Sequence, residues 1–256
     1  MSRFWRSALV IGLSLMASAC GRKGPLIYQD MLVPAAPAAT SARQSGSAVK
    51  LNFTLPDRDR AGSPLRGIVG LKIGRRTAET DQKDVCRSCM TDYMPYRTLY
   101  LDNLPATTQR FGNSLIMLDG DVNAGNSYSY SIVSFTADGV DGASAATADV
   151  RVAVPLPAPV LSIESLPTEV KLRISSQPLN SGRLLGYNLY RYTAANARSF
   201  LPINKEPLTG GVYVDSGLER GVKYIYSART LVQQASGGVM ESTESKEVEG
   251  LLKDDE

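Results

Sequence analysis

Three patterned segments occur twice along the chain in the same order, and this repeat constrains the possible folds more than any other feature of the sequence. The first copies are residues 49–53, 70–75 and 119–130, and the second copies are residues 170–174, 186–191 and 215–226. The longest pair shares the pattern Asp-x-x-(Val/Leu)-x-x-Gly-x-x-Tyr-x-Tyr, which begins at Asp119 and again at Asp215. Three matched blocks in one order indicate that a domain has been duplicated.

Each repeated segment alternates apolar and polar residues. Val49, Leu51 and Phe53 fall on one side of an extended chain, whereas Lys50 and its alternate neighbours fall on the other. Tyr128, Tyr130, Ile132 and Ser134 share one face in the same way, as do Tyr224, Tyr226 and Ala228. Period-two alternation in short segments that are bounded by Gly, Pro and Asp is typical of antiparallel sheets. We therefore expect an all-β protein, with no long amphipathic helix beyond the first twenty residues.

The spacing from Val122 through Gly125 to Tyr128 indicates which kind of β fold this is. In immunoglobulin-like sandwiches, a tyrosine near the start of strand F directs its hydroxyl back to upstream backbone, after a turn that suits glycine. Both copies of the pattern resemble this tyrosine corner. The resemblance implies two tandem immunoglobulin-like (fibronectin type III-like) sandwiches, with another two-sheet β fold as the alternative. The only tryptophan is Trp5, so Phe53 and Ile174 are expected to fill the core position that a strand B tryptophan usually occupies.

Composition shifts suggest where the domains begin and end. Residues 31–48 are rich in Pro, Ala and Ser and predict a flexible stalk, and the proline-rich residues 155–159 predict a semi-rigid linker. We therefore expect five segments. They are a signal peptide at 1–19, a lipidated N-terminus and stalk at 20–45, a first sandwich at 46–155, a second at 156–250, and an acidic tail at 251–256.

The first twenty residues have the form of an export signal. Arg3 and Arg6 precede an apolar run that is shorter than the roughly 20 residues needed to span a bilayer, and small residues precede Cys20. This arrangement resembles a bacterial lipoprotein signal, although Ala17 stands where a large aliphatic residue is usual. The resemblance implies cleavage before Cys20, attachment of lipid to it and anchoring in a membrane. An ordinary secretory signal is the alternative.

Residues 20–26 read Cys-Gly-Arg-Lys-Gly-Pro-Leu. They are similar to the Cys-Gly-x-Lys-Gly-Pro-Leu start of a family of short Gram-negative outer-membrane lipoproteins, one of which assists the lipopolysaccharide export pore. The resemblance implies an outer-membrane location facing the periplasm, with exposure at the cell surface as a further option. Arg22 and Lys23 also suit a simpler role, because two cations beside anionic headgroups strengthen anchoring.

The first domain contains an insertion with two cysteines. The offset between the copies falls from 116 residues to 96 between the second and third segments, so extra residues lie between strands C and E, around Cys86 and Cys89. A local disulfide is favoured, because an exported chain meets an oxidising compartment. A redox-active thiol pair, a metal site and free or intermolecular thiols are the other interpretations. A metal site would need further ligands, and the chain has no histidine.

The same insertion ends in an aromatic stretch. Tyr93, Tyr96, Arg97 and Tyr100 form either a protein-binding face or a strand whose tyrosines cover the edge of the sandwich. We hypothesise that this stretch and the cysteine loop are the contact surface of the first domain.

The composition excludes several classes of enzyme and argues against one class of partner. With no histidine, hydrolases that use a histidine base and histidine-bound zinc are excluded, and no phosphate loop or nucleophile elbow is present. A net charge of +3 argues against nucleic acid as the main partner. The sequence thus predicts a non-enzymatic, lipid-anchored binding or scaffold protein of the cell envelope, without a cofactor, whose partner is a protein or glycan and whose oligomeric state is open. The alternatives are an assembly helper for outer-membrane machinery and thiol–disulfide exchange through Cys86 and Cys89.

Overall fold

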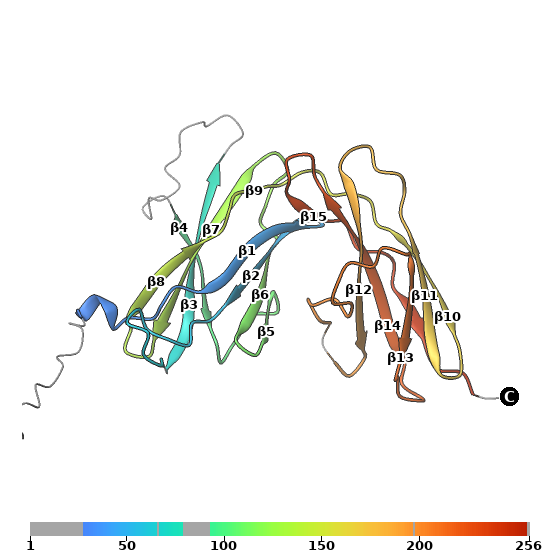
Figure 1. The fold of residues 1–256 in the computed structure, drawn as a ribbon, viewed down its shortest axis with the longest axis horizontal. Helices are drawn as coiled ribbons and strands as arrows, with labels where there is room; N and C mark the ends of the chain where they lie inside the picture. The colour runs from blue at the N-terminus through green and yellow to red at the C-terminus, as the bar shows by residue number, and fades with distance from the viewer. Residues whose placement is uncertain (1–27, 66, 79–92, 197, 255–256) are drawn as a thin grey trace, which may run out of the picture.

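The computed structural model describes residues 28–254 except 66, 79–92 and 197, and its regular structure in these residues is β apart from one short 3₁₀ turn, η1 (Gln29–Met31). Two sandwiches follow one another along the chain (Figure 1). The predicted all-β fold with tandem sandwiches is therefore confirmed. No helix in the described part of the chain is long and apolar enough to cross a membrane.

The first sandwich packs two sheets against each other. One sheet contains β1 (Ala38–Ser45), β2 (Ala48–Thr54), β6 (Ser114–Asp119) and β5 (Thr108–Phe111), in that order. The other contains β4 (Met94–Tyr100), β3 (Ile68–Ala78), β7 (Ser127–Thr136) and β8 (Asp141–Ala146), with β9 (Val150–Arg151) also paired to β7. All pairs within this sandwich are antiparallel.

The second sandwich repeats the arrangement with fewer strands. Its first sheet is β10 (Val160–Ser165), β11 (Glu169–Ser175) and β13 (Val212–Ser216). Its second sheet is β12 (Arg183–Thr193), β14 (Tyr224–Gln233) and β15 (Val239–Glu241), with β16 (Val248–Gly250) also paired to β14.

The repeated segments form matching strands of the two sandwiches. Residues 49–53 and 170–174 lie in β2 and β11, residues 70–75 and 186–191 in β3 and β12, and the tyrosine pairs begin β7 and β14. Their predicted inward faces are buried, and Phe53 (1% exposed) and Ile174 (6% exposed) fill the two cores as expected. The apolar alternation therefore identified the core correctly.

The tyrosine corner is present in both sandwiches. The Tyr128 hydroxyl accepts a 2.9 Å hydrogen bond from the Asn123 N–H, and the Tyr224 hydroxyl accepts one of 3.1 Å from the Glu219 N–H. Gly125 lies in the turn before Tyr128 at φ +96°, a left-handed backbone conformation that glycine adopts without the steric penalty of a side chain. The same hydrogen bond, from a backbone N–H to the tyrosine hydroxyl, thus fixes the start of strand β7 and of strand β14.

The prediction of a flexible stalk over residues 31–48 is wrong for β1. Residues 38–45 pair along β2, and Gln44 exchanges hydrogen bonds with the backbone of Ala153 at 2.8 and 2.9 Å. Backbone pairing and one amide side chain hold this strand, with only Ala42 packed against the core. Because its side chains are mostly small and polar, no apolar alternation marked it in the sequence.

Strand β1 also joins the two sandwiches. Ser45 of β1 pairs in parallel with Glu241 of β15, so the β1–β2–β6–β5 sheet of the first sandwich continues into the β12–β14–β15 sheet of the second (Figure 1). Residues 155–159 run between β9 and β10, and the Leu156 carbonyl accepts hydrogen bonds from the N–H and the hydroxyl of Thr243. The linker is thus bonded to the second sandwich.

Candidate functional site

Each sandwich contains a buried arginine–aspartate–tyrosine group built from the repeated segments. In the first, Arg75 lies 3.0 Å from the Asp119 carboxylate, which also accepts a 2.8 Å hydrogen bond from the Tyr130 hydroxyl. In the second, Arg191 and Tyr226 bond Asp215 at 2.7 and 2.8 Å. Since the same three residue types meet in both copies, we assign these groups to the stability of the sandwich.

Tyr96 and Arg97, two of the predicted protein-binding residues, belong to the Asp119 group. The Tyr96 hydroxyl donates to Asp119 at 2.7 Å, and the Arg75 guanidinium lies 4.2 Å from its ring centre. Arg97 lies 5.2 Å from the same ring and 3.6 Å from the carboxylate of Asp121. Burial alone would raise the pKa of Asp119, but hydrogen bonds from Tyr96, Arg75 and Tyr130 outweigh it and hold the pKa below its usual range.

Tyr93 and Tyr100, the other two predicted residues, lie at opposite ends of β4. The seven residue steps from one to the other correspond to about 23 Å of extended chain, at roughly 3.3 Å per step. Tyr93 stacks with Arg76 at 5.3 Å, whereas Tyr100 is 54% exposed and meets the edge of Phe135 at 5.8 Å between ring centres. The structure therefore brings Tyr96 and Arg97 together and leaves Tyr100 as the exposed aromatic of the four.

The three cysteines lie outside the described residues. Lipid attachment at Cys20 and a disulfide or thiol pair at Cys86 and Cys89 therefore stay predictions. Within the described residues, no three Cys, Asp or Glu side chains are grouped as metal ligands would be.

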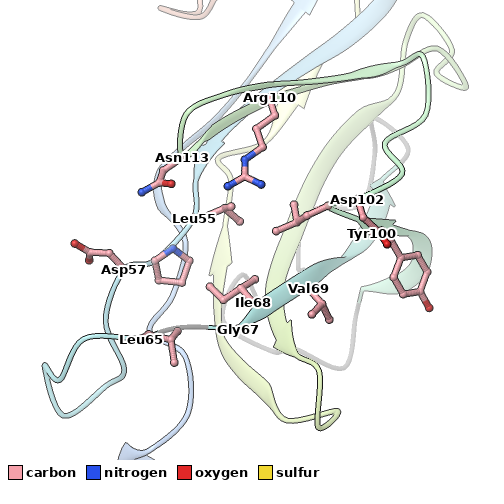
Figure 2. A pocket seen from close by; sticks show the side chains of 12 residues that line it. Leu55, Asp57, Leu65, Gly67, Ile68, Val69, Tyr100, Asp102, Arg110 and Asn113 are labelled. Atoms are coloured by element: carbon pink, nitrogen blue, oxygen red, sulfur yellow. The ribbon is translucent and has the colours of Figure 1, made fainter.

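Tyr100 lines a cleft of about 540 Å³ at one end of the first sandwich (Figure 2). The segment that follows β2 forms one wall, the start of β3 and the end of β4 form another, and β5 contributes Arg110. Leu55, Ile68 and Leu101 also contact the core of the sandwich, so the floor of the cleft is the open end of that core. The remaining lining residues are Pro56, Asp57, Leu65, Gly67, Val69, Asp102 and Asn113.

Arg110 is the cation among the described residues that line this cleft, and its guanidinium points toward Leu55 (Figure 2). Its Nε donates a 2.7 Å hydrogen bond to the Gly112 carbonyl. Among the described residues no carboxylate lies within ion-pair distance of Arg110, in contrast to Arg75 and Arg191. The cleft thus combines an apolar floor with a positive charge that has no counterion in the part of the chain that the structure describes.

A second charged group lies between the sandwiches and is centred on Glu241, which is fully buried. Its carboxylate accepts hydrogen bonds from Ser45 at 2.6 Å, Asn188 at 2.7 Å and Tyr190 at 3.1 Å, and lies 3.2 Å from Arg43. Burial would raise the pKa of Glu241, but the charges of Lys50 and Arg43 and these hydrogen bonds lower it. Ser45, Arg43 and Lys50 come from the first sandwich, so this carboxylate binds the two sandwiches together.

Lys50 is the buried cation of the same junction, with a side chain only 4% exposed. Its ammonium donates a 2.7 Å hydrogen bond to the Phe200 carbonyl of the second sandwich and lies 3.9 Å from Glu241. Burial is the largest cause that lowers its pKa to about 8; Glu241 opposes the shift, and Arg43 and Arg229 add to it. Gln109 of the first sandwich adds hydrogen bonds to the backbone of Phe200 and Arg198.

Sequence reasoning missed Lys50, Glu241 and Arg110. Lys50 was placed correctly on the outward face of its strand, and its counterpart in the repeat, Lys171, is only half-buried there. What buries Lys50 is the second sandwich, and no periodicity within one strand reports a neighbouring domain. Arg110 is a single arginine in a polar hairpin, and no sequence pattern around it indicates that it lines a cleft.

Comparison with known proteins does not assign the chain to a family. No protein-family model matches the sequence, and no curated protein matches it. One similar solved structure is the FN1–FN3 domains of chicken CNTN1, at 12% identity, covering 87% of this chain and 68% of that one with a TM-score of 0.33.

Proposed function

We propose that this chain is a non-enzymatic, lipid-anchored protein of the bacterial cell envelope that holds neighbouring molecules on a rigid pair of sandwiches. The outer membrane is the proposed location, with Cys20 as the point of attachment and the sandwiches in the periplasm. The partner is an envelope protein or glycan.

The observation that carries this proposal is the buried junction around Glu241. A scaffold transmits a fixed geometry only when its modules do not rotate freely, and freely jointed sandwiches would need no buried charges between them. Glu241, Lys50 and Asn188 are each at most 5% exposed and bond across or beside the junction. Separating the sandwiches would leave these groups without their partners, which costs several kcal/mol per buried charge.

The proposed anchor is close to the first sandwich. Seven residues lie between Cys20 and Tyr28, where the described chain begins, and the eight steps from one to the other span at most about 29 Å when fully extended. Attachment at Cys20 would therefore keep the first sandwich near the membrane surface.

The anchor is tested by Cys20→Ser in the native host. The wild-type chain should incorporate an alkyne analogue of palmitate and sediment with membranes, whereas Cys20→Ser should take up no label and lose membrane retention. Cys86→Ser is the matched control, because it removes a cysteine that the proposal does not place on the lipid. Equal labelling of wild type and Cys20→Ser would overturn lipid anchoring.

Partner binding is tested by a photoreactive amino acid at Tyr100 and, separately, at Leu184, which are exposed positions of the first and second sandwich. A scaffold should give discrete crosslinked products in whole cells, identified by mass spectrometry. The yield of these products at either position should fall in the Glu241→Gln variant, because that change loosens the junction. A chain that yields only monomer at both positions contradicts a binding role.

A further inference from the structure

We propose that the cleft at the end of the first sandwich binds one acyl chain of an anionic membrane lipid, with the Arg110 guanidinium holding the negative headgroup. This rests on the proposed function, because attachment at Cys20 is what brings the cleft to a membrane.

The apolar part of the cleft suits a hydrocarbon chain. Its volume of about 540 Å³ lies within the range of small-molecule sites, most of whose lining is apolar. Leu55, Leu65, Ile68, Val69 and Leu101 supply that lining. An acyl chain placed there would remove apolar surface from water, both its own and that of these side chains, which favours binding.

The charged part of the cleft selects an anion. Among the described residues, only the Nε donor of Arg110 is used, by the Gly112 carbonyl, and a guanidinium matches the oxygens of a phosphate or carboxylate. Asp57 also lines the cleft, but its carboxylate points away from the space between Arg110 and Leu55 (Figure 2). Asp102 lies beside Tyr100, whereas the Arg110 guanidinium points toward the apolar Leu55 (Figure 2).

The position of the cleft identifies the membrane as the source of the ligand. The wall that follows β2 is bonded to the N-terminal segment: the Ala35 N–H donates to the Arg58 carbonyl at 3.0 Å, and the Ala61 N–H donates to the Met31 carbonyl at 3.0 Å. The segment that leads back to Cys20 therefore leaves the fold beside the cleft. An anchor at Cys20 would place this end of the sandwich nearest the lipid headgroups.

The test is photolabelling of the full chain reconstituted in phosphatidylcholine vesicles. One preparation contains phosphatidylglycerol with a diazirine in its acyl chain, a second contains phosphatidylcholine with the same diazirine chain, and a third receives the free diazirine fatty acid. Mass spectrometry locates the adducts. The variants are Arg110→Ala and Arg110→Lys, with Arg151→Ala as the matched control, because Arg151 is an exposed arginine of the same sandwich outside the cleft.

We expect phosphatidylglycerol adducts on the peptides that carry Leu65, Ile68 and Leu101. Arg110→Ala should lower this labelling about tenfold, to the level of phosphatidylcholine, because a hydrogen-bonded ion pair is lost. Arg110→Lys should keep part of it, and Arg151→Ala should leave it unchanged. A circular dichroism spectrum identical to wild type shows that Arg110→Ala folds.

Three outcomes would overturn the proposal: adducts spread evenly over the chain, equal labelling by the two phospholipids, or full labelling of Arg110→Ala. Cleft labelling by the free fatty acid alone would overturn the membrane as its source. A failure of the proposed lipid anchor can be distinguished from a failure of the cleft. If Cys20 carries no lipid, Cys20→Ser should be labelled by phosphatidylglycerol as strongly as the wild type. With a working anchor, Cys20→Ser should lose phospholipid labelling and keep that by the free fatty acid.

Discussion

The Tyr130 hydroxyl donates a 2.8 Å hydrogen bond to the buried carboxylate of Asp119, and the same bond joins Tyr226 to Asp215 at 2.8 Å in the second sandwich. The two carboxylates differ in their other partners. Asp119 also accepts from Tyr96, Arg75 and the Asp121 N–H, whereas the side-chain bonds of Asp215 among the described residues come from Arg191 and Tyr226. One repeated bond therefore lies in two networks of different size.

Tyr226→Phe should destabilise the protein more than Tyr130→Phe. Each change removes one hydrogen bond to a buried carboxylate, which costs about 1.5–3 kcal/mol. Asp119 keeps more partners after the loss, so Tyr130→Phe belongs at the lower end of this range. Urea unfolding followed by circular dichroism measures both values. Tyr192→Phe, whose hydroxyl bonds an exposed glutamate, should leave the midpoint unchanged, and a larger effect for Tyr130→Phe would contradict the comparison.

Alanine at either repeated glycine, Gly70 or Gly186, should destabilise its own sandwich. A Cβ at Gly70 would lie 2.5 Å from the Leu99 carbonyl oxygen and against the Phe135 ring, and one at Gly186 would lie 2.7 Å from the Leu208 carbonyl oxygen. Such overpacking costs about 1–3 kcal/mol. Thermal unfolding of both variants checks this, and Gly120→Ala is the control, because nothing lies within 4 Å of its added Cβ.

The duplicated sandwiches could be predicted because the repeated residues act within one domain. Apolar alternation reports which face of a strand meets its own core, and the glycine and tyrosine of the corner report a local turn, so both patterns are visible along the chain. Strand β1 was missed for the opposite reason. Its position depends on backbone pairing with β2 and on the bonds of Gln44 to Ala153, neither of which needs an apolar pattern.

The candidate site could be predicted only in part. Tyr100 was predicted as a binding residue and lines the cleft. For Tyr96 and Arg97, the sequence does not show that Asp119 bonds the first and Asp121 pairs with the second. The cleft itself is assembled from the segment after β2, the start of β3, the end of β4 and Arg110. Residues so far apart in the chain share no spacing from which their proximity could be inferred.

Glu241→Gln should loosen the junction between the sandwiches. Glutamine keeps the shape of the side chain but leaves Lys50 buried without its opposite charge, and breaking a buried pair costs about 3–5 kcal/mol. Arg43 also loses its opposite charge, but its side chain is one-third exposed, so water solvates part of that charge. We therefore expect the lower end of this range, a loss of about 3 kcal/mol in the free energy of unfolding.

Urea unfolding gives this value, and small-angle scattering should show a broader distribution of shapes. Glu249→Gln is the control, because its partner Lys223 and Glu249 itself are both about 60% exposed. The double variant Glu241→Gln/Lys50→Met should recover part of the lost stability, since it removes the uncompensated cation. A double variant as unstable as the sum of the single variants would contradict the direct coupling of Lys50 and Glu241.

The buried ammonium of Lys50 also predicts how stability changes at alkaline pH. Its pKa is about 8 in the folded chain against the ordinary value of 10.5, so between these values the folded chain has released a proton that the unfolded chain retains. Unfolding then takes up a proton, and the contribution of Lys50 to stability must rise with pH across this window, by at most about 1.4 kcal/mol per pH unit. Among the groups that face it, Glu241 has its pKa lowered and Tyr190 has its pKa raised by burial and by Glu241, so neither of them changes its charge over this range. The free energy of unfolding of the wild type minus that of Lys50→Met, measured from pH 7 to pH 9.5, should therefore be flat below the folded pKa and increase above it. A difference that stays constant or falls would mean that Lys50 keeps its proton in the junction.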